Sequence, residues 1–158
     1  MTTLSFGHSD TEDRLWITLP NGGPQLWLTR RLISLLLRHL VEQLTATCPG
    51  GDIVGSLQDV HRVALEHETA NETEGDAASP PHEPELPLKQ ARRVHLITTM
   101  HLTVGPSAIE IELLAAGFHH SLKLQRAEAH RLAGVLYRRA QAADWAIQGM
   151  PVWLQRTS

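Results

Sequence analysis

Hydrophobic and polar residues alternate over three short segments near the start of the chain. These predicted strands cover residues 3–8, 14–19 and 25–28. From Thr29 to about Leu44 the apolar positions change to the spacing of a helix face. The first part of the chain is therefore predicted to fold as strand, strand, strand, helix.

The same order occurs near the end of the chain. Residues 94–104, 109–113 and 118–124 alternate as strands do, and residues 126–145 have helical spacing. A shift of 96 positions aligns leucine and arginine residues of the two parts. The aligned pairs are Leu26 with Leu122, Leu28 with Leu124, Arg30 with Arg126, Leu36 with Leu132, and Leu40 with Leu136.

These patterns predict an α+β fold made of two pseudo-repeated βββα halves. Together the halves are expected to form a mostly antiparallel sheet of about six strands, with both long helices on one face. We expect one domain over residues 1–158, because the length and 42% hydrophobic content suit a single core. Its parts are a first half (1–48), an acidic insert (49–90), a second half (91–148) and an apolar tail (149–158).

Charge separates the insert from the rest of the chain. Residues 49–90 contain nine acidic residues and two basic ones, whereas the remainder has a balance of +4. Residues 70–90 combine turn formers with acids and have no hydrophobic period, which predicts disorder. Residues 53–68 are compatible with a short helix whose apolar side would be Val60, Val63, Ala64 and Leu65.

The segment LWITLPNGGPQLWL predicts a hairpin with two facing tryptophans. A four-residue loop at 20–23 pairs Trp16 with Trp27, and it pairs the neighbouring apolar residues on the opposite face. Those pairs are Leu15 with Leu28 and Ile17 with Leu26. The indoles then lie on the sheet face away from the helices. They either stabilise the hairpin by about 0.2 to 1 kcal/mol, or are covered by a second subunit, by the tail at 150–154 or by a ligand.

The first helix has more apolar residues than one sheet can cover, since they extend beyond a stripe of about 100°. The excess is covered either by the second helix of the same chain or by another copy. We therefore expect a partner to bind through six residues: Trp16, Trp27, Leu32, Leu36, Leu40 and Trp153.

In the second half, the alternation places Val94, Leu96, Met100, Leu102 and Val104 on the inner face of the sheet. On the outer face, His101 is expected opposite Glu110 or Glu112, depending on whether the loop has two or four residues. The second helix carries an expected electrostatic surface: Arg126, Arg131, Arg138 and Arg139. The acidic insert either is a solvated spacer that joins the two halves or folds back on these arginines and competes with an acidic partner.

Candidate chemistry is sparse. The segment His67–Asn71 has only the first two residues of the HExxH zinc motif, and the adjacent His119 and His120 point to opposite faces of a strand. Cys48 is the single cysteine, so no internal disulfide is expected. No nucleotide-binding or hydrolase motif is present, so we expect no metal, no cofactor and no small-molecule ligand, and we assign no catalytic residue.

The sequence predicts neither a secretory signal nor a membrane span, which makes the cytoplasm the expected location. Its apolar excess predicts a protein-interaction or adaptor module that self-associates as a homo-oligomer or binds another protein. The alternative is a single-stranded nucleic-acid-binding protein, in which outward Trp16 and Trp27 would stack on bases.

Overall fold

The fold is α+β, as predicted, but it contains two sheets rather than one. A four-stranded sheet, a three-stranded sheet and four helices occur within the described residues. The computed structural model describes the following residues: 4–9, 11–20, 23–47, 57–72, 93–105 and 107–155.

The first sheet begins as an antiparallel meander of β1 (Ser5–Ser9), β2 (Arg14–Thr18) and β3 (Gln25–Thr29). Trp16 pairs with Trp27 in this sheet, and the flanking apolar pairs are also those predicted from the loop length. The pairing is local: Leu19 N donates to Pro24 O at 3.1 Å, which closes the loop between β2 and β3. The predicted hairpin register is confirmed.

Strand β4 (Val94–Leu96) completes the first sheet by pairing in parallel with β3. The chain then crosses to the second sheet: Ile97 N donates to Trp27 O, whereas Thr98 N donates to Leu114 O, both at 2.9 Å. The prediction of one continuous strand over 94–104 is therefore wrong, and so is the single six-stranded sheet. Because the crossing inverts the alternation, Ile97 is buried while Val94 and Leu96, expected to face inward, are exposed.

The second sheet is an antiparallel meander of β5 (Thr99–Val104), β6 (Ala108–Ala115) and β7 (Phe118–Gln125). His101 faces Glu112, the pairing expected for the four-residue loop. Ile109, Ile111 and Leu113 are buried, as the alternation predicted. The β6–β7 turn requires a glycine, because Gly117 has a φ of +68°.

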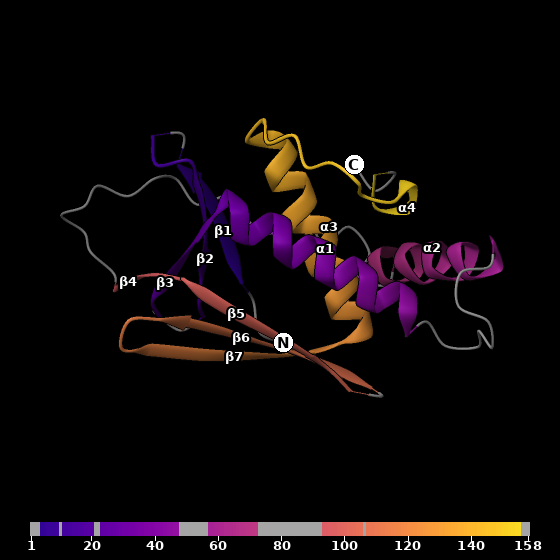
Figure 1. Cartoon of the computed structure of the whole chain (residues 1–158), viewed down its shortest axis with the longest axis horizontal. Coiled ribbons are helices and arrows are strands. Elements are labelled where there is room, and N and C mark those ends of the chain that lie inside the picture. The colour runs from indigo at the N-terminus through magenta and orange to yellow at the C-terminus, as the bar shows by residue number, and fades with distance from the viewer. Residues whose placement is uncertain are drawn as a thin grey trace.

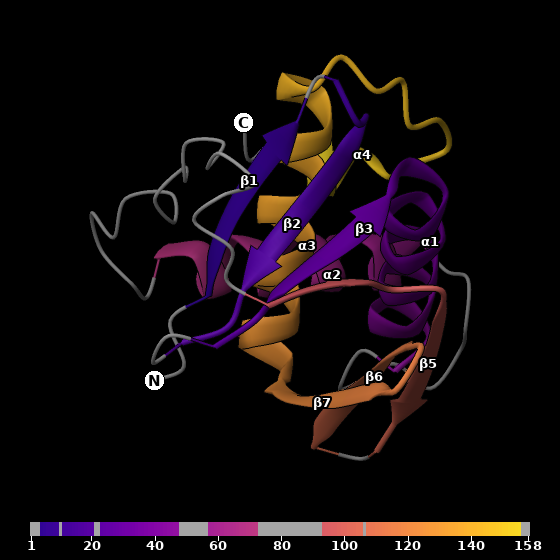
Figure 2. The same cartoon turned by 90° about the vertical axis from the view of Figure 1, so that its left-hand side faces the viewer.

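The two long helices are α1 (Arg30–Ala46) and α3 (Arg126–Ala142). Thr29 accepts a hydrogen bond from Leu32 N at the start of α1, and Gln125 begins α3 with a capping box to Glu128. Figures 1 and 2 show α1 in contact with α3, with β1–β3 at one end and β5–β7 on another side. The internal repeat stays a prediction, since the shared order of elements does not by itself make the halves equivalent.

Two further helices complete the core on the other side of α3: α2 (Leu57–Glu72) and the short α4 (Val152–Gln155). Helix α2 lies within the acidic insert, but its buried side is Val63, His67 and Ala70, while Leu65 is 64% exposed. The predicted apolar side is therefore wrong at Leu65. The predicted disordered linker lies outside the described residues from position 73 onward.

Candidate functional site

The tryptophan pair forms as predicted, but it is not an open aromatic surface. The rings of Trp16 and Trp27 stack with centroids 5.6 Å apart and planes at 23°. Trp16 is only 1% exposed, and a Cβ added to Gly7 on the neighbouring strand would overlap its ring. Trp27 is half-buried, and its Nε1 donates to Gln25 Oε1 at 3.3 Å. Trp16, which was expected to bind a partner, is thus already enclosed by the chain itself.

Most of the apolar excess of α1 is covered within the chain. Leu36 and Leu40, expected to meet a partner, are buried in the core. The reason is geometric: α1 contacts α3, β3 and β5, so its apolar residues are covered from several sides instead of by one sheet. Leu32 and Leu35 stay half-buried, and they mark the part of the helix that the chain itself leaves open.

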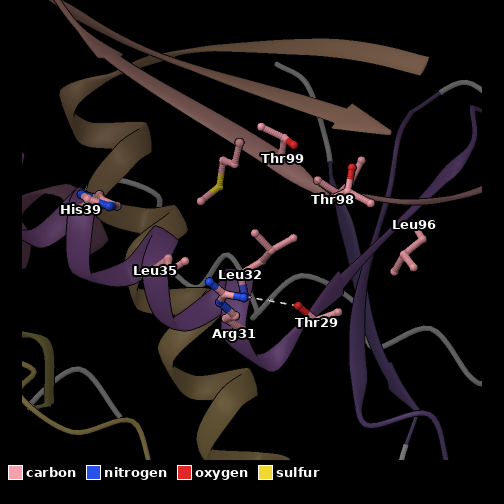
Figure 3. A pocket seen from close by; sticks show the side chains of 10 residues that line it. Thr29, Arg31, Leu32, Leu35, His39, Leu96, Thr98 and Thr99 are labelled. Atoms are coloured by element: carbon pink, nitrogen blue, oxygen red, sulfur yellow. Dashed lines mark hydrogen bonds between the residues drawn. The ribbon is translucent and has the colours of Figure 1, made fainter. Parts of the chain in front are cut away.

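A groove of about 450 Å³ lies beside this open part of α1, between the helix and the β4–β5 crossing. Figure 3 shows its side chains coming from the helix on one side and from the strand on the other. Leu32 and Leu35 line it from α1, and Leu96 and Met100 from the strands. Leu96 is 39% exposed, and Val94 on the same strand is 49% exposed. We call this surface the α1–β4 groove.

The α1–β4 groove has a basic border. Arg31 and His39 line it from α1, and among the described lining residues there is no carboxylate. The nearest acid along the helix is Glu42, whose Oε2 lies 3.7 Å from His39 Nδ1. The groove therefore combines the exposed Leu96 and two half-buried leucines with cationic and imidazole groups.

The four arginines predicted as an electrostatic surface instead make contacts within the fold. Arg126 donates to both carboxylate oxygens of Glu66, from Nε at 2.7 Å and from Nη2 at 3.0 Å. It also donates to Thr47 Oγ1 and Leu44 O at the end of α1. Arg126 therefore ties α3 to both α1 and α2.

The remaining three arginines are also partly buried. Arg131 Nη1 donates to Ala70 O at 3.2 Å, which joins α3 to α2. Burial lowers the pKa of Arg138 and of Arg139 from the ordinary arginine value. Within the described part of the insert, helix α2 contacts α3 through Glu66 and Ala70, and the four arginines do not form an open basic patch.

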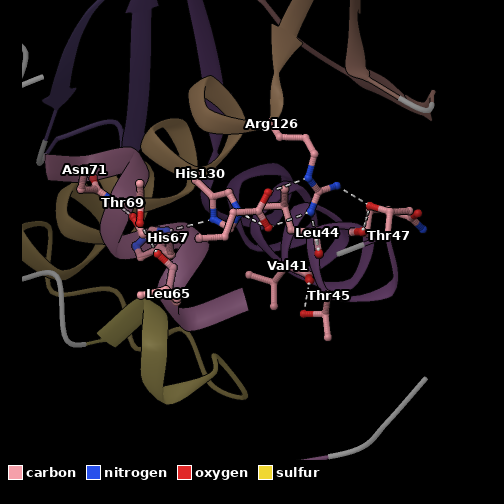
Figure 4. A network of polar contacts seen from close by, with 12 residues as sticks. Val41, Leu44, Thr45, Thr47, Leu65, His67, Thr69, Asn71, Arg126 and His130 are labelled. Carbon is pink, nitrogen blue, oxygen red and sulfur yellow. Dashed lines mark hydrogen bonds and ion pairs between the residues drawn. The ribbon is translucent and has the colours of Figure 1, made fainter. Parts of the chain in front are cut away.

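A pair of buried histidines extends the contact between Arg126 and Glu66. His67 and His130 are fully buried, and their Nδ1 atoms lie 3.1 Å apart (Figure 4). His130 Nε2 lies 3.1 Å from Glu66 Oε2. The facing Nδ1 atoms accommodate one proton between them, so the two rings cannot both be imidazolium without opposing N–H groups. The geometry therefore requires at least one neutral ring.

The electrostatics of the network agree with a neutral pair. Burial lowers the pKa of His67 to about 4, with smaller lowering by His130 and Arg138. Burial also lowers the pKa of His130, although Glu66 acts in the opposite direction. For Glu66 itself, burial raises the pKa, but hydrogen bonds from Arg126 and His130 outweigh it and lower the value.

Trp153 covers the histidine pair and is not an open contact for a partner. Its ring centroid lies 4.8 Å from that of His67 and 5.7 Å from that of His130, and its side chain is buried. Both imidazoles are enclosed, so they contribute to the packing of α2, α3 and α4. The sequence signal for them was the i, i+4, i+7 spacing of Val63, His67 and Ala70 on α2.

The described histidines on the second sheet and on the neighbouring β4 do not gather into a metal site. His119 Nε2 lies 3.2 Å from Glu112 Oε1 on the outer face, while the His95 ring stacks on Phe118 with centroids 4.0 Å apart. Over the described ranges, no three His, Cys, Asp or Glu residues are arranged to hold a metal ion.

In the same part of the chain, no helix combines the length and the apolar character needed to cross a bilayer.

Two surfaces result from this geometry: the α1–β4 groove, which is open, and the histidine network, which is closed. Of the residues expected to bind a partner, Leu32 lines the groove, Trp27 pairs with β4 beside it, and the others are buried. The sequence predicted that Leu96 faces inward, because alternation over residues 94–104 does not show that the chain crosses between sheets at Ile97. Comparison of the chain with protein-family models, with curated proteins and with solved structures found no match.

Proposed function

We propose that this protein is a self-associating protein-interaction module that binds through the α1–β4 groove. The observation that carries the proposal is the half-buried Leu35 and the 39% exposed Leu96, which lie on facing sides of one groove. Removing apolar surface from water contributes roughly 25 cal/mol per Å², so a partner that covers these side chains gains binding free energy. Polar groups at the border, such as Arg31 and Thr99, provide orientation.

Nucleic-acid binding is less well supported. Base stacking needs an exposed aromatic ring, and Trp16 is enclosed while Trp27 stacks on it. The outer face of the second sheet presents Glu110 and Glu112, whose carboxylates repel phosphate groups. The groove between α1 and β4–β5 is therefore the better candidate surface.

Sedimentation velocity and light scattering over a roughly hundredfold concentration range test this proposal. The wild-type protein is expected to associate, and Leu35→Glu is expected to raise the dissociation constant at least about tenfold, because it places a charge in the apolar groove. Leu65→Glu is the matched control, since Leu65 is exposed on α2, away from the groove lining. A wild-type monomer at every concentration, or equal effects of the two variants, would overturn the proposal.

A further inference from the structure

The face of α1 that borders the groove carries an ordered set of charges. Arg31, Leu35, Arg38 and Glu42 follow one another at intervals of four, three and four residues, so they lie along one side of the helix. The three charged members are exposed, and Leu35 is half-buried. We call these four residues the α1 stripe.

The charges of α1 oppose the dipole of their own helix. The first turn contains Arg30 and Arg31 and no acid, while the last turn contains no base. A helix N-terminus is favoured by negative charge and its C-terminus by positive charge. Helix α3 follows this rule, with Glu128 in its first turn and Arg139 in its last turn. Helix α1 therefore has basic residues at the end where the helix dipole favours acidic ones.

Arg30 is compensated within the chain, but the α1 stripe lies on a different side of the helix. Arg30 Nη2 donates to Asp13 Oδ1 at 3.2 Å, and its guanidinium lies 5.3 Å from the centre of the Trp145 ring. Arg31 instead lines the open groove. The side chain of Glu42 is 58% exposed to solvent. A partner with the opposite charge order would place a complementary charge beside each end of the stripe.

We propose that this partner is a second copy of the chain, whose α1 packs antiparallel against α1 across a two-fold axis; this pairing rests on the self-association proposed above. Antiparallel packing places Arg31 of each copy opposite Glu42 of the other, and Leu35 opposite the aliphatic part of Arg38. The arrangement is self-complementary, as a two-fold interface requires. It also places the negative end of one helix dipole beside Arg31 of the other copy.

Parallel packing of the same face is disfavoured by charge. It would bring Arg31 beside Arg31 and Glu42 beside Glu42, and like charges at an interface suppress a wrong arrangement. The antiparallel helix also covers the apolar groove that borders the stripe, including Leu32 and Leu96. One arrangement thus covers the leucines of the groove and pairs the charges of α1.

Charge reversal tests the pairing. Arg31→Glu and Glu42→Arg are each expected to raise the dimer dissociation constant about tenfold at low salt, because each change turns two attractive contacts into repulsive ones. The double variant R31E/E42R restores the opposite charges and is expected to return to within about threefold of wild type. Arg62→Glu, an exposed reversal on α2, is the control and should leave the constant unchanged.

The outcomes separate this inference from the proposed function. Association that is lost in Leu35→Glu but unaffected by the charge reversals overturns the antiparallel pairing and leaves the groove as an interface. A wild-type monomer overturns the proposed function, and the pairing with it. Lack of recovery in the double variant also counts against the pairing, provided that circular dichroism shows a folded protein.

Cysteine cross-linking gives a second, independent measurement. In a Cys48→Ser background, Arg31→Cys and Glu42→Cys proteins are mixed and oxidised. The antiparallel pairing predicts disulfide-linked heterodimers, because positions 31 and 42 of different copies face each other. Cross-linked homodimers of the Arg31→Cys protein alone would show parallel packing and would overturn the inference.

Discussion

Acidification is expected to destabilise this fold between about pH 6.5 and pH 4, because His67 is buried in its neutral form. In the unfolded chain the imidazole has its ordinary pKa of 6.5, whereas in the folded protein burial lowers the pKa to about 4. Over this interval the unfolded state binds more protons than the folded state. The contribution to stability is therefore present above pH 6.5 and decreases as the pH falls towards 4.

The two pKa values set the size of the effect. The difference between 6.5 and about 4 corresponds to about 3 kcal/mol of unfolding free energy. Such a loss is a large fraction of the stability of an ordinary domain, which is about 5 to 15 kcal/mol. His130 adds to the loss in the same direction, because its pKa is also lowered by burial. Removing His67 should therefore reduce the pH dependence without abolishing it.

Urea unfolding of wild type and His67→Gln, followed by tryptophan fluorescence and circular dichroism at several pH values from 7 to 4, measures this difference. Glutamine keeps hydrogen-bonding capacity but does not titrate. Wild type is expected to lose about 3 kcal/mol more than the variant across the interval. His101→Gln, on an exposed strand position, is the control and should follow wild type. Equal pH dependence in wild type and His67→Gln would refute the reasoning.

Three further substitutions test the packing described above by urea unfolding at pH 7. Arg126→Gln is expected to destabilise the fold by about 2 kcal/mol, because Glu66 loses two charge-assisted hydrogen bonds. Arg62→Gln, at an exposed position of α2, is the control, and equal stability of the two variants would contradict this prediction. Gly7→Ala should cost about 1 to 3 kcal/mol through overlap with Trp16, and the loss should shrink when Trp16→Phe is added to both proteins. Trp153→Ala should cost about 3 kcal/mol or more and increase hydrogen exchange in α2, whereas Val152→Ala, an exposed neighbour, should have little effect.

Local features of this protein were predictable from its sequence. The register of the β2–β3 hairpin follows from a four-residue loop and from alternation, both of which involve residues close together in the chain. The starts of α1 and α3 follow from the change of hydrophobic spacing and from capping residues such as Thr29. Near Gly105 the alternation predicted only that His101 faces Glu110 or Glu112, and the structure has Glu112 in that position.

The division into two sheets was not predictable, because alternation reports which residues share a face of one strand and not which sheet that strand joins. Residues 94–104 look continuous, yet Ile97 and Thr98 bond to different sheets. That choice depends on the free edges of β3 and β6, which are distant in sequence. The exposure of Leu96, and with it the open groove, is a consequence of this crossing.

The sequence by itself determined the approximate positions of β1–β3, β6 and β7, the long helices α1 and α3, and the register of the β2–β3 hairpin, since those depend on backbone geometry and on neighbouring side chains. Only the tertiary structure decided which apolar residues are enclosed. Leu40 is buried where α1 packs against α3, a helix far from it in the chain, whereas Leu35 stays accessible. The contact of Glu66 with Arg126 joins residues 60 positions apart. Burial and ion pairing of this kind depend on long-range packing, for which hydrophobic periodicity carries no information about the partner.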